Sequence, residues 1–323
     1  MNELKKLHIV FLDGHTLHAT PQQIEMLESC GDLTIFDRTE ESEVISRSKE
    51  ADVLIVNKTP LQATTLKQLP KLRLVCVAGT GFDKVDAVTA RQLGITVCNC
   101  ANYSTRAVAQ MALSLLLEAA DHTGYYTHEN LNGRWCQSKD FSYVSIPRVD
   151  LEGKKAAIIG FGHIGQTFAD MLRPLGLQLY AVSSKSQDQL PTDVTKVDID
   201  QAFAECDIVS LNCPLCETNR GFVNATLLQK AKSGLILINT ARGALVNEQD
   251  VAEALTQHRL YAYCTDVLSQ EPPLPDNPLL SAPGVFVTPH IGWMTSQTVE
   301  RIINIICNNI QGFINGKPLN VVN

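Results

Sequence analysis

The fold depends on ten residues, Ala156-Ala157-Ile158-Ile159-Gly160-Phe161-Gly162-His163-Ile164-Gly165. The four apolar residues predict a strand, the glycines a tight turn, and the spacing of Ile164, Phe168, Met171 and Leu172 a helix. In such a turn the first glycine permits the bend, the second lets N–H groups approach a pyrophosphate, and the third lets helix and strand pack closely. The helix N-terminus adds partial positive charge. The stretch therefore predicts dinucleotide binding; a glycine-rich turn without a ligand is the alternative.

The end of the next strand bears on the choice of coenzyme. About 20 residues beyond the glycines, such domains usually place an acidic residue that holds the ribose hydroxyls of NAD. Here the strand ends in Ala181-Val182-Ser183-Ser184-Lys185. No carboxylate is present to repel a ribose phosphate, and two hydroxyls with a lysine could bind one. We expect NADP to be accepted; the alternative is that Ser183 or Ser184 hydrogen-bonds the ribose of NAD.

Short strand-like runs alternate with helical runs on both sides of this stretch, as in parallel sheets covered by crossover helices. A first series of strands is expected near residues 7–12, 33–36, 53–56, 72–77 and 95–98. A long helical run at about 105–121 and a polar segment at 124–150 follow. A second series is expected at 156–159, 177–182, 207–212, 234–239, 260–266 and 285–288. These six parallel strands suit a doubly wound nucleotide-binding fold.

The last helical pattern determines the expected domain organisation. Residues 296–314 place on one face the apolar residues Val299, Ile302, Ile303, Ile306, Ile310 and Phe313. That face should dock on a core, and we expect the core to be that of the first domain. The expected fold is therefore α/β with two doubly wound parallel-sheet domains. A Rossmann-type cofactor domain of residues 102–294 is inserted in a discontinuous, flavodoxin-like substrate domain of residues 1–101 and 295–323.

Composition excludes several classes of function. The 323 residues include 34 acidic and 27 basic ones, a net charge of -7, and no long basic run, so nucleic acid is not expected as a partner. The longest apolar stretch, 111–120, is shorter than the roughly 20 residues of a membrane span. The N-terminus lacks a signal-peptide core. Ten cysteines lie mostly in apolar runs, as in the reducing cytosol. We expect a cytoplasmic protein that acts on a small molecule.

Three polar residues follow strand-like runs in the second half of the chain. Arg242 comes after 237–241, Glu271 lies just past 265–268, and His290 follows 287–289. Ligands of open α/β sheets bind outside the carboxyl ends of the strands, where these side chains project, so we expect them to share one site. Singly, Arg242 could be a surface ion-pair former, Glu271 a solvated loop acid and His290 a capping residue.

Hydride transfer to a 2-keto acid is the chemistry that needs this trio. Arg242 can hold the substrate carboxylate with two parallel hydrogen bonds and so orient the carbonyl carbon. An imidazole titrates close to neutral pH, so His290 can donate a proton in reduction and remove it in oxidation. Glu271 would favour the imidazolium and hold its tautomer. Asp266 could accept a hydrogen bond from the nicotinamide carboxamide.

Four stretches carry a resemblance to a known family. They are Gly160 to Gly165, Asn239-Thr240-Ala241-Arg242-Gly243, Asp266 through Glu271-Pro272, and Thr288-Pro289-His290-Ile291-Gly292-Trp293. With them, the chain resembles the D-isomer-specific 2-hydroxyacid dehydrogenases over essentially its full length. A narrower resemblance, to bacterial glycerate dehydrogenases or hydroxypyruvate reductases, is carried by Phe11-Leu12-Asp13-Gly14, Asn57-Lys58-Thr59-Pro60, Asp276-Asn277-Pro278-Leu279-Leu280 and the tail 316–323.

The resemblance implies roles for further residues. It implies that Arg242, Glu271 and His290 are catalytic, as argued above. The backbone N–H groups of Ala78-Gly79-Thr80-Gly81 are a second grip on the substrate carboxylate, and Trp293 is a further substrate contact. Coenzyme contacts are expected at the glycine turn and at Ser183, Ser184, Lys185, Thr240, Ala241, Asp266 and Gly292. A homodimer is also implied, built through the cofactor domains with residues 124–150 reaching across, and no metal is expected.

Two positions depart from the family pattern. The family usually has an acidic residue where Ser183 stands, which leaves NAD preference open here. Cys216 occupies a place usually filled by a hydroxyl residue, and it forms a CxxC pattern with Cys213. A single such pair is weak evidence for a metal or redox site. We expect two free thiols.

The sequence thus predicts an NAD- or NADP-dependent oxidoreductase acting on CH–OH donors. The leading hypothesis is reduction of hydroxypyruvate, and of glyoxylate, to the D-2-hydroxy acid. One alternative is a relative acting on another short 2-keto acid, such as pyruvate or a branched analogue. The other is an NADH-sensing binding protein, since the corepressors that resemble this family retain the corresponding trio.

Overall fold

The computed structural model describes residues 6–323, which form two compact units. One, the small unit, consists of the segment up to Ser104 together with Met294–Asn323; the other, the large unit, is Thr105–Trp293. The chain thus leaves the first unit, completes the second and returns. The units divide between 104 and 105 and between 293 and 294, where the sequence placed the boundaries between 101 and 102 and between 294 and 295.

The small unit contains a five-stranded sheet in the order β2-β1-β3-β4-β5, with all strands parallel. Its strands are β1 (His8–Phe11), β2 (Asp32–Ile35), β3 (Val53–Val56), β4 (Leu74–Val77) and β5 (Thr96–Cys98). The two strands β3 and β4 are buried along their whole length, which is why they read as unbroken apolar runs. This strand order is that of the flavodoxin-like fold.

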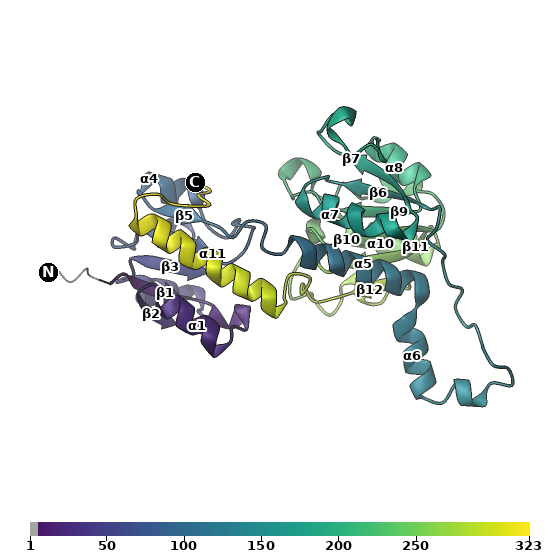
Figure 1. Cartoon of the computed structure of the whole chain (residues 1–323), viewed down its shortest axis with the longest axis horizontal. Coiled ribbons are helices and arrows are strands. Elements are labelled where there is room, and N and C mark those ends of the chain that lie inside the picture. The colour runs from purple at the N-terminus through teal and green to yellow at the C-terminus, as the bar shows by residue number, and fades with distance from the viewer. Residues whose placement is uncertain (1–5) are drawn as a thin grey trace. The chain divides into compact units, whose positions relative to one another are not determined.

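Helices from both ends of the chain cover this sheet. They are α1 (Pro21–Glu28), α2 (Val44–Ser48), α3 (Ala63–Leu66), α4 (Ala87–Gln92) and α11 (Ser296–Ile314). The last helix, α11, packs against α1 and β4 and runs across the unit in yellow in Figure 1. Its buried residues include Ile302, Ile303 and Ile306. The apolar face predicted from the sequence is therefore the face that docks on the small unit.

The large unit contains a seven-stranded parallel sheet in the order β12-β11-β10-β9-β6-β7-β8. Its strands are β6 (Lys155–Ile159), β7 (Gln178–Val182), β8 (Val194–Lys196), β9 (Ile208–Leu211), β10 (Leu235–Asn239), β11 (Leu260–Thr265) and β12 (Val285–Val287). Strand order reverses between β6 and β9, which is the Rossmann-type switch point. The sequence missed β8, because only Val194 of this three-residue edge strand is buried.

Helices cover both faces of the large sheet. They are α5 (Thr105–Asp121), α6 (Thr123–Leu131), α7 (His163–Leu172), α8 (Ile199–Glu205), α9 (Ala225–Gln229) and α10 (Glu248–Thr256). Along β6, Ala156 and Ile158 join the core formed with α5 and α7, whereas Ala157 and Ile159 join the core formed with α8, α9 and α10. Alternate residues therefore enter different cores, and a strand buried on both faces needs apolar residues throughout.

An arm formed by residues 124–150 extends from the body of the large unit (Figure 1). It contains most of α6 and the short 3-10 helix Trp135–Gln137, and β6 begins only after it. The side chain of Tyr143 donates to Asn130 at 2.6 Å and lies edge-on to Tyr126. The two chain segments of the arm are thus tied to each other.

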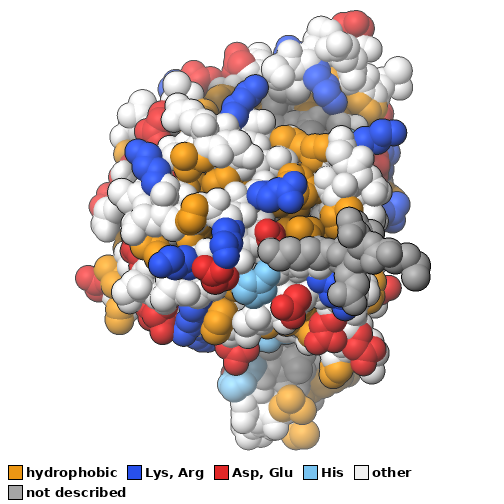
Figure 2. All heavy atoms as spheres, turned by 90° about the vertical axis from the view of Figure 1, so that its left-hand side faces the viewer, with side chains coloured by type: hydrophobic (Ala, Val, Ile, Leu, Met, Phe, Trp, Pro, Cys, Tyr) orange, Lys and Arg blue, Asp and Glu red, His pale blue; other side chains and the backbone are white. Residues whose placement is uncertain are grey.

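Figure 2 shows the distribution of charged side chains on one face of the protein. On the face shown in Figure 2, Lys and Arg side chains stand apart from one another, with Asp and Glu among them. No helix within residues 6–323 has both the length and the apolarity to cross a bilayer.

Candidate active site

The glycine turn joins β6 to α7 and lies beside the end of β9. Gly160 has a φ of +94°, and a Cβ there would lie 2.6 Å from the backbone nitrogen of Cys213. A Cβ on Gly165 would lie 2.3 Å from the carbonyl oxygen of Gly160, so the helix approaches the turn as closely as backbones allow. Glycine is required at both positions for the turn itself.

Gly162 has a different environment. Within the part of the chain that the structure describes, no atom lies within 4 Å of the Cβ position of Gly162. This residue is the N-cap of α7, and no side chain caps the helix there. The N-terminus of α7 is therefore uncapped and has open space beside Gly162, which suits the phosphates of a dinucleotide.

The residues after β7 bring a positive charge to this turn. The N–H of Lys185 donates to Ser183 Oγ at 3.2 Å, and the Nζ of Lys196 donates to the carbonyl of Lys185 at 2.6 Å. Lys185 Nζ lies 5.9 Å from the ring centre of Phe161 in the glycine turn. Ser183 and Lys185 therefore stand next to the glycine turn that precedes α7.

Asn239, at the end of β10, shapes the turn that presents Arg242. Its side-chain nitrogen donates to the carbonyl of Arg242 at 2.9 Å, and its oxygen accepts from the N–H of Ala241 at 3.1 Å. The guanidinium of Arg242 is exposed, and Nη1 donates to the carbonyl of Ala241 at 2.7 Å. The buried hydroxyl of Thr240 has no hydrogen-bond partner among the described residues. This turn thus offers one free hydroxyl and an accessible guanidinium.

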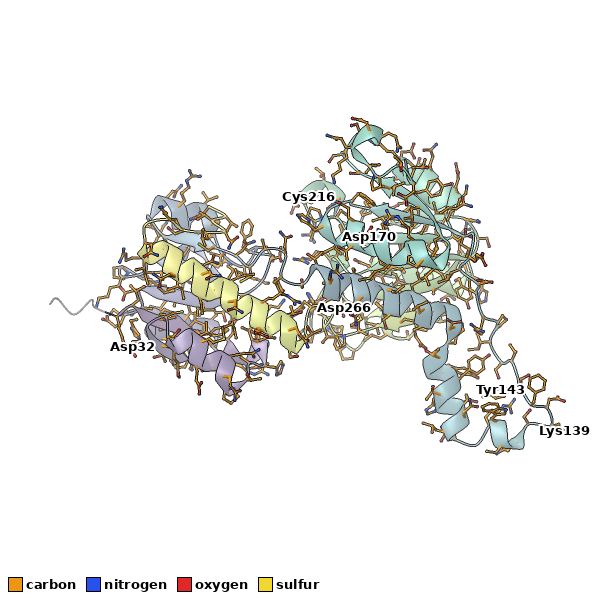
Figure 3. The ribbon with its side chains drawn as sticks, in the orientation of Figure 1. Asp32, Lys139, Tyr143, Asp170, Cys216 and Asp266 are labelled. Atoms are coloured by element: carbon orange, nitrogen blue, oxygen red, sulfur yellow. The ribbon has the colours of Figure 1, made fainter. Side chains whose placement is uncertain are left out.

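Asp266 holds the segment that carries His290. Its Oδ1 accepts from the hydroxyl of Thr288 at 2.6 Å and from the N–H of Ile291 at 3.0 Å, and its Oδ2 accepts from the N–H of Gly292 at 2.7 Å. The residue, labelled in Figure 3, is 3% exposed, and burial raises the pKa of its carboxyl. A carboxylate can accept about four hydrogen bonds, so one position remains for the expected contact with the carboxamide.

His290 and Glu271 form a hydrogen-bonded pair. His290 Nδ1 lies 2.6 Å from Glu271 Oε2, and the other carboxylate oxygen accepts from the N–H of Leu268 at 3.0 Å. His290 has a φ of +55°, in the left-handed region. Because Nδ1 faces the carboxylate, the tautomer or cation that donates from Nδ1 is favoured, and Nε2 is left for a substrate.

The segments of Arg242 and Glu271 pack directly together. A Cβ on Gly243 would lie 1.9 Å from the backbone carbon of Leu268, so only glycine permits this approach. Glu248, at the start of α10, accepts from the N–H of Ser269 at 2.7 Å and fixes the same segment. The structure therefore brings the segments of Arg242 and Glu271 together, and the hydrogen bond between Glu271 and His290 adds the third residue.

The expected substrate loop lies in the small unit. The N–H of Ala78 donates to the carbonyl of Val56 at 2.7 Å, so the prediction that it binds the substrate carboxylate is wrong for this residue. The carbonyls of Gly79 and Thr80 accept from Cys100 N at 2.9 Å and Asn99 Nδ2 at 2.8 Å. Its carbonyls are therefore anchored. For the N–H groups at positions 79–81, the described residues provide no acceptor within hydrogen-bond distance.

Two of the four stretches behind the narrower resemblance, 11–14 and 57–60, meet beside this loop. The buried carboxylate of Asp13 accepts from the N–H groups of Asn57, Lys58 and Thr59 at 2.9, 2.6 and 2.7 Å. A Cβ on Gly79 would lie 3.7 Å from Asn57 Oδ1. The turn after β3 is thereby fixed next to the proposed carboxylate grip.

The remaining predicted residues have simple placements. Trp293 is 9% exposed and ends the large unit. His163 is exposed at the first position of α7, and Phe161 is buried in the core, so it can offer a ligand little beyond its backbone. Cys213 and Cys216 are free thiols. Burial raises the pKa of Cys213, and a hydrogen bond with Thr218 lowers that of Cys216.

Sequence reasoning did not assign roles to Asn239, Thr288 and Glu248, which position the site. The signal for Asn239 was present, since Asn at a strand end commonly hydrogen-bonds the backbone two residues on. Thr288 and Glu248 act across 22 and 21 residues of sequence, on Asp266 and Ser269. No local pattern indicates such contacts.

Comparison with known proteins agrees with this geometry. Residues 113–292 match the family model "D-isomer specific 2-hydroxyacid dehydrogenase, NAD binding domain". The chain is 36% identical to a hydroxypyruvate reductase of Blautia hydrogenotrophica over 98% of this chain and 100% of that protein. It is 34% identical to a glycerate dehydrogenase of Methylorubrum extorquens over 97% and 98%. A solved Thermus thermophilus protein superposes with a TM-score of 0.88 at 27% identity, over 98% of this chain and 100% of that one.

Proposed function

Because the chain belongs to the D-isomer specific 2-hydroxyacid dehydrogenase family, we propose that it reduces hydroxypyruvate, and glyoxylate, to the corresponding D-2-hydroxy acid. Members of the family are oxidoreductases that act on CH–OH donors with NAD(P). The observation that carries the proposal is the His290–Glu271 pair at 2.6 Å, on a segment held by Asp266 at the carboxyl edge of a sheet with an open glycine turn.

The side chains divide the chemistry among them. The chemistry that a bound nicotinamide coenzyme supplies is hydride transfer to the carbonyl carbon. Arg242 binds the substrate carboxylate through its exposed guanidinium, aided in this proposal by the N–H groups of residues 79–81. His290 donates a proton from Nε2 to the carbonyl oxygen as negative charge develops there, and Glu271 stabilises the imidazolium at Nδ1. In the reverse direction, the same imidazole removes the proton.

The residues of the large unit suit such a coenzyme. The N–H groups at the start of α7 would hold the pyrophosphate in the space that Gly162 leaves open. The unpartnered hydroxyl of Thr240 and the backbone around Ala241 and Gly292 would contact the nicotinamide end. Asp266 would accept from the carboxamide at its remaining position.

An initial-rate assay over a panel of keto acids tests the proposed function. With NADPH and with NADH, we expect kcat/KM to be highest for hydroxypyruvate, followed by glyoxylate, and low for pyruvate and branched analogues. A clear preference for pyruvate would assign the chain to another short 2-keto acid. Absence of turnover with every acid, together with tight NADH binding, would instead support a nucleotide-sensing binding protein.

We also propose that the coenzyme site accepts NADP. This proposal is supported by the position of Ser183 and Lys185 next to the glycine turn, and by the serine at position 183 where a carboxylate would otherwise stand. An ammonium and hydroxyls bind a phosphate monoester, whereas a carboxylate would repel it. A kcat/KM with NAD tenfold or more above that with NADP would show that Ser183 or Ser184 instead serves the ribose of NAD.

Ser183→Asp should reduce kcat/KM with NADPH about tenfold or more, because the new carboxylate would repel the ribose phosphate. A repulsion of about 1.4 kcal/mol corresponds to that factor. The value with NADH should be unchanged or higher. Gln178→Glu is the matched control, since it adds a carboxylate at the exposed, opposite end of the same strand. Equal losses with both coenzymes would show that the substitution only disturbs the fold.

A homodimer is part of the proposal, with the arm of residues 124–150 in the interface. Large apolar side chains on the arm are exposed, with Phe141 at 91% and Leu131 at 84%. Val144 and Trp135 are exposed beside them. Exposed apolar clusters of this kind mark association sites.

We also propose a reducing cytosol as the location, since all ten cysteines are free thiols.

Phe141→Asp should shift the protein from dimer toward monomer, because it places a charge in an apolar interface. Light scattering coupled to size-exclusion chromatography measures the mass over a dilution series. Val88→Asp is the control, since Val88 is 70% exposed on α4 in the small unit. A monomeric wild-type protein, or an unchanged dimer in Phe141→Asp, would place the interface elsewhere.

A further inference from the structure

Two cysteines outside the proposed active site face each other in the small unit. Cys30 follows α1, and Cys307 lies within α11, the helix that packs against α1 (Figure 1). Both thiols donate to the same acceptor, the carbonyl oxygen of Met26, from 3.7 Å and 3.5 Å. Both are partly exposed. The two sulfur atoms therefore converge on one point that solvent can reach.

The two thiols also interact with each other, and this interaction shifts their pKa values in opposite directions. The Cys307 thiol stabilises the Cys30 thiolate and lowers the pKa of Cys30 to about 7. The same interaction raises the pKa of Cys307. A lowered pKa favours the thiolate of Cys30, which is the form of cysteine that reacts with oxidants.

The other cysteines of the small unit are buried and have raised pKa values. Cys76 and Cys98 are paired across β4 and β5, and both are buried, as is Cys100. Burial raises the pKa of Cys98 to about 11 and that of Cys100 to about 12. They remain protonated and inaccessible, so reactivity in this unit is concentrated on Cys30.

We propose that Cys30 and Cys307 form a reversible dithiol–disulfide pair that responds to peroxides. The Cys30 thiolate attacks a peroxide oxygen, the O–O bond breaks, and Cys30 becomes a sulfenic acid. The leaving hydroxide or alkoxide takes up a proton from solvent and departs as water or an alcohol. The sulfur of Cys307 then attacks that of Cys30, and its proton leaves with the hydroxyl as water. Two thiols are thereby oxidised and one peroxide is reduced; a small dithiol reverses the step by exchange.

The disulfide would have a structural consequence because the small unit is made from two separate segments of chain. Non-covalent packing joins the segment up to Ser104 to Met294–Asn323. A bond between positions 30 and 307 would tie them covalently and enclose the whole large unit in a loop. Closing so long a loop removes much conformational entropy from the unfolded chain. The oxidised protein should therefore unfold at a higher temperature.

Peptide mapping of the full-length protein after treatment with hydrogen peroxide tests the proposal. Under non-reducing conditions we expect one cross-linked species that joins the peptides of Cys30 and Cys307, lighter by two hydrogen atoms than their sum. The unfolding temperature should rise by several degrees and return to its starting value with dithiothreitol. Cys30→Ser and Cys307→Ser should each abolish both effects.

Cys136→Ser is the matched control, since Cys136 is exposed on the arm and should leave both effects intact. The mapping of the wild-type protein does not depend on whether any variant folds. Recovery of Cys30 as a sulfinic acid beside an unmodified Cys307, or of both as free thiols, would overturn the proposal. So would a cross-link to Cys76 in place of Cys307.

Discussion

His290→Gln is expected to lower kcat for hydroxypyruvate reduction by about three orders of magnitude and to leave NADPH binding unchanged. Glutamine cannot deliver a proton at neutral pH, and positioned general acids contribute roughly 10²- to 10⁴-fold. The imidazole touches Glu271 through Nδ1 and has Nε2 free for the substrate. Steady-state kinetics and a coenzyme titration by fluorescence, both on the same preparation, measure the two quantities.

His258→Gln is the matched control for this substitution. His258 is exposed in the large unit and has the same φ of +55° as His290. Any cost of placing glutamine in a left-handed backbone conformation is therefore the same in both variants. A His290→Gln enzyme within tenfold of wild type, with His258→Gln equally active, would remove the imidazole from the mechanism.

Arg242→Gln is expected to have the second largest effect, a fall in kcat/KM of roughly 10²- to 10³-fold, expressed mainly as a higher KM. The loss of a charge-assisted bidentate contact costs about 2–5 kcal/mol. Arg242→Lys should lie between wild type and Arg242→Gln, because a lysine keeps the charge but not the planar fork. Initial rates over a range of hydroxypyruvate concentrations give both constants.

Arg242→Gln should not change the stability of the fold, so the change in KM can be assigned to substrate binding. The Arg242 guanidinium is exposed and donates to the carbonyl of its neighbour Ala241, while the turn is held by the side chain of Asn239. Thermal unfolding should thus be the same for Arg242→Gln and wild type. Arg259→Gln, at a partly exposed arginine elsewhere in the same unit, is the control. Unchanged KM in Arg242→Gln would assign the carboxylate to another residue.

The sequence predicted the parts of the fold that local chemistry dictates. The fold class and the family are confirmed, because three glycines in fixed positions and continuous apolar strands admit few other structures. The reasoning that placed Arg242, Glu271 and His290 at one edge used only the rule that parallel strands end together. The structure pairs Glu271 with His290, although the catalytic roles of the trio remain predictions.

Features that depend on tertiary packing could not be predicted from the sequence. Strand β8 was not predicted, because an edge strand with one buried residue has no apolar pattern. The hold of Asp266 on residues 288–292 escaped because it joins groups 22 to 26 residues apart. The left-handed backbone of His290 could not be predicted either, since few non-glycine residues adopt it and no local pattern marks this one.

One buried acid, Asp266, holds the segment that carries His290. Acidification can therefore lower the activity by protonating Asp266 as well as by protonating the imidazole. Because burial raises the pKa of Asp266, this carboxyl takes up a proton at a higher pH than an ordinary aspartate. Two of its three partners are amide N–H groups, which cannot accept that proton; only the hydroxyl of Thr288 can. When this carboxyl is protonated, its hold on the segment weakens. The activity lost at acid pH should therefore reflect a loosened backbone at residues 288–292 as well as the chemistry of the substrate.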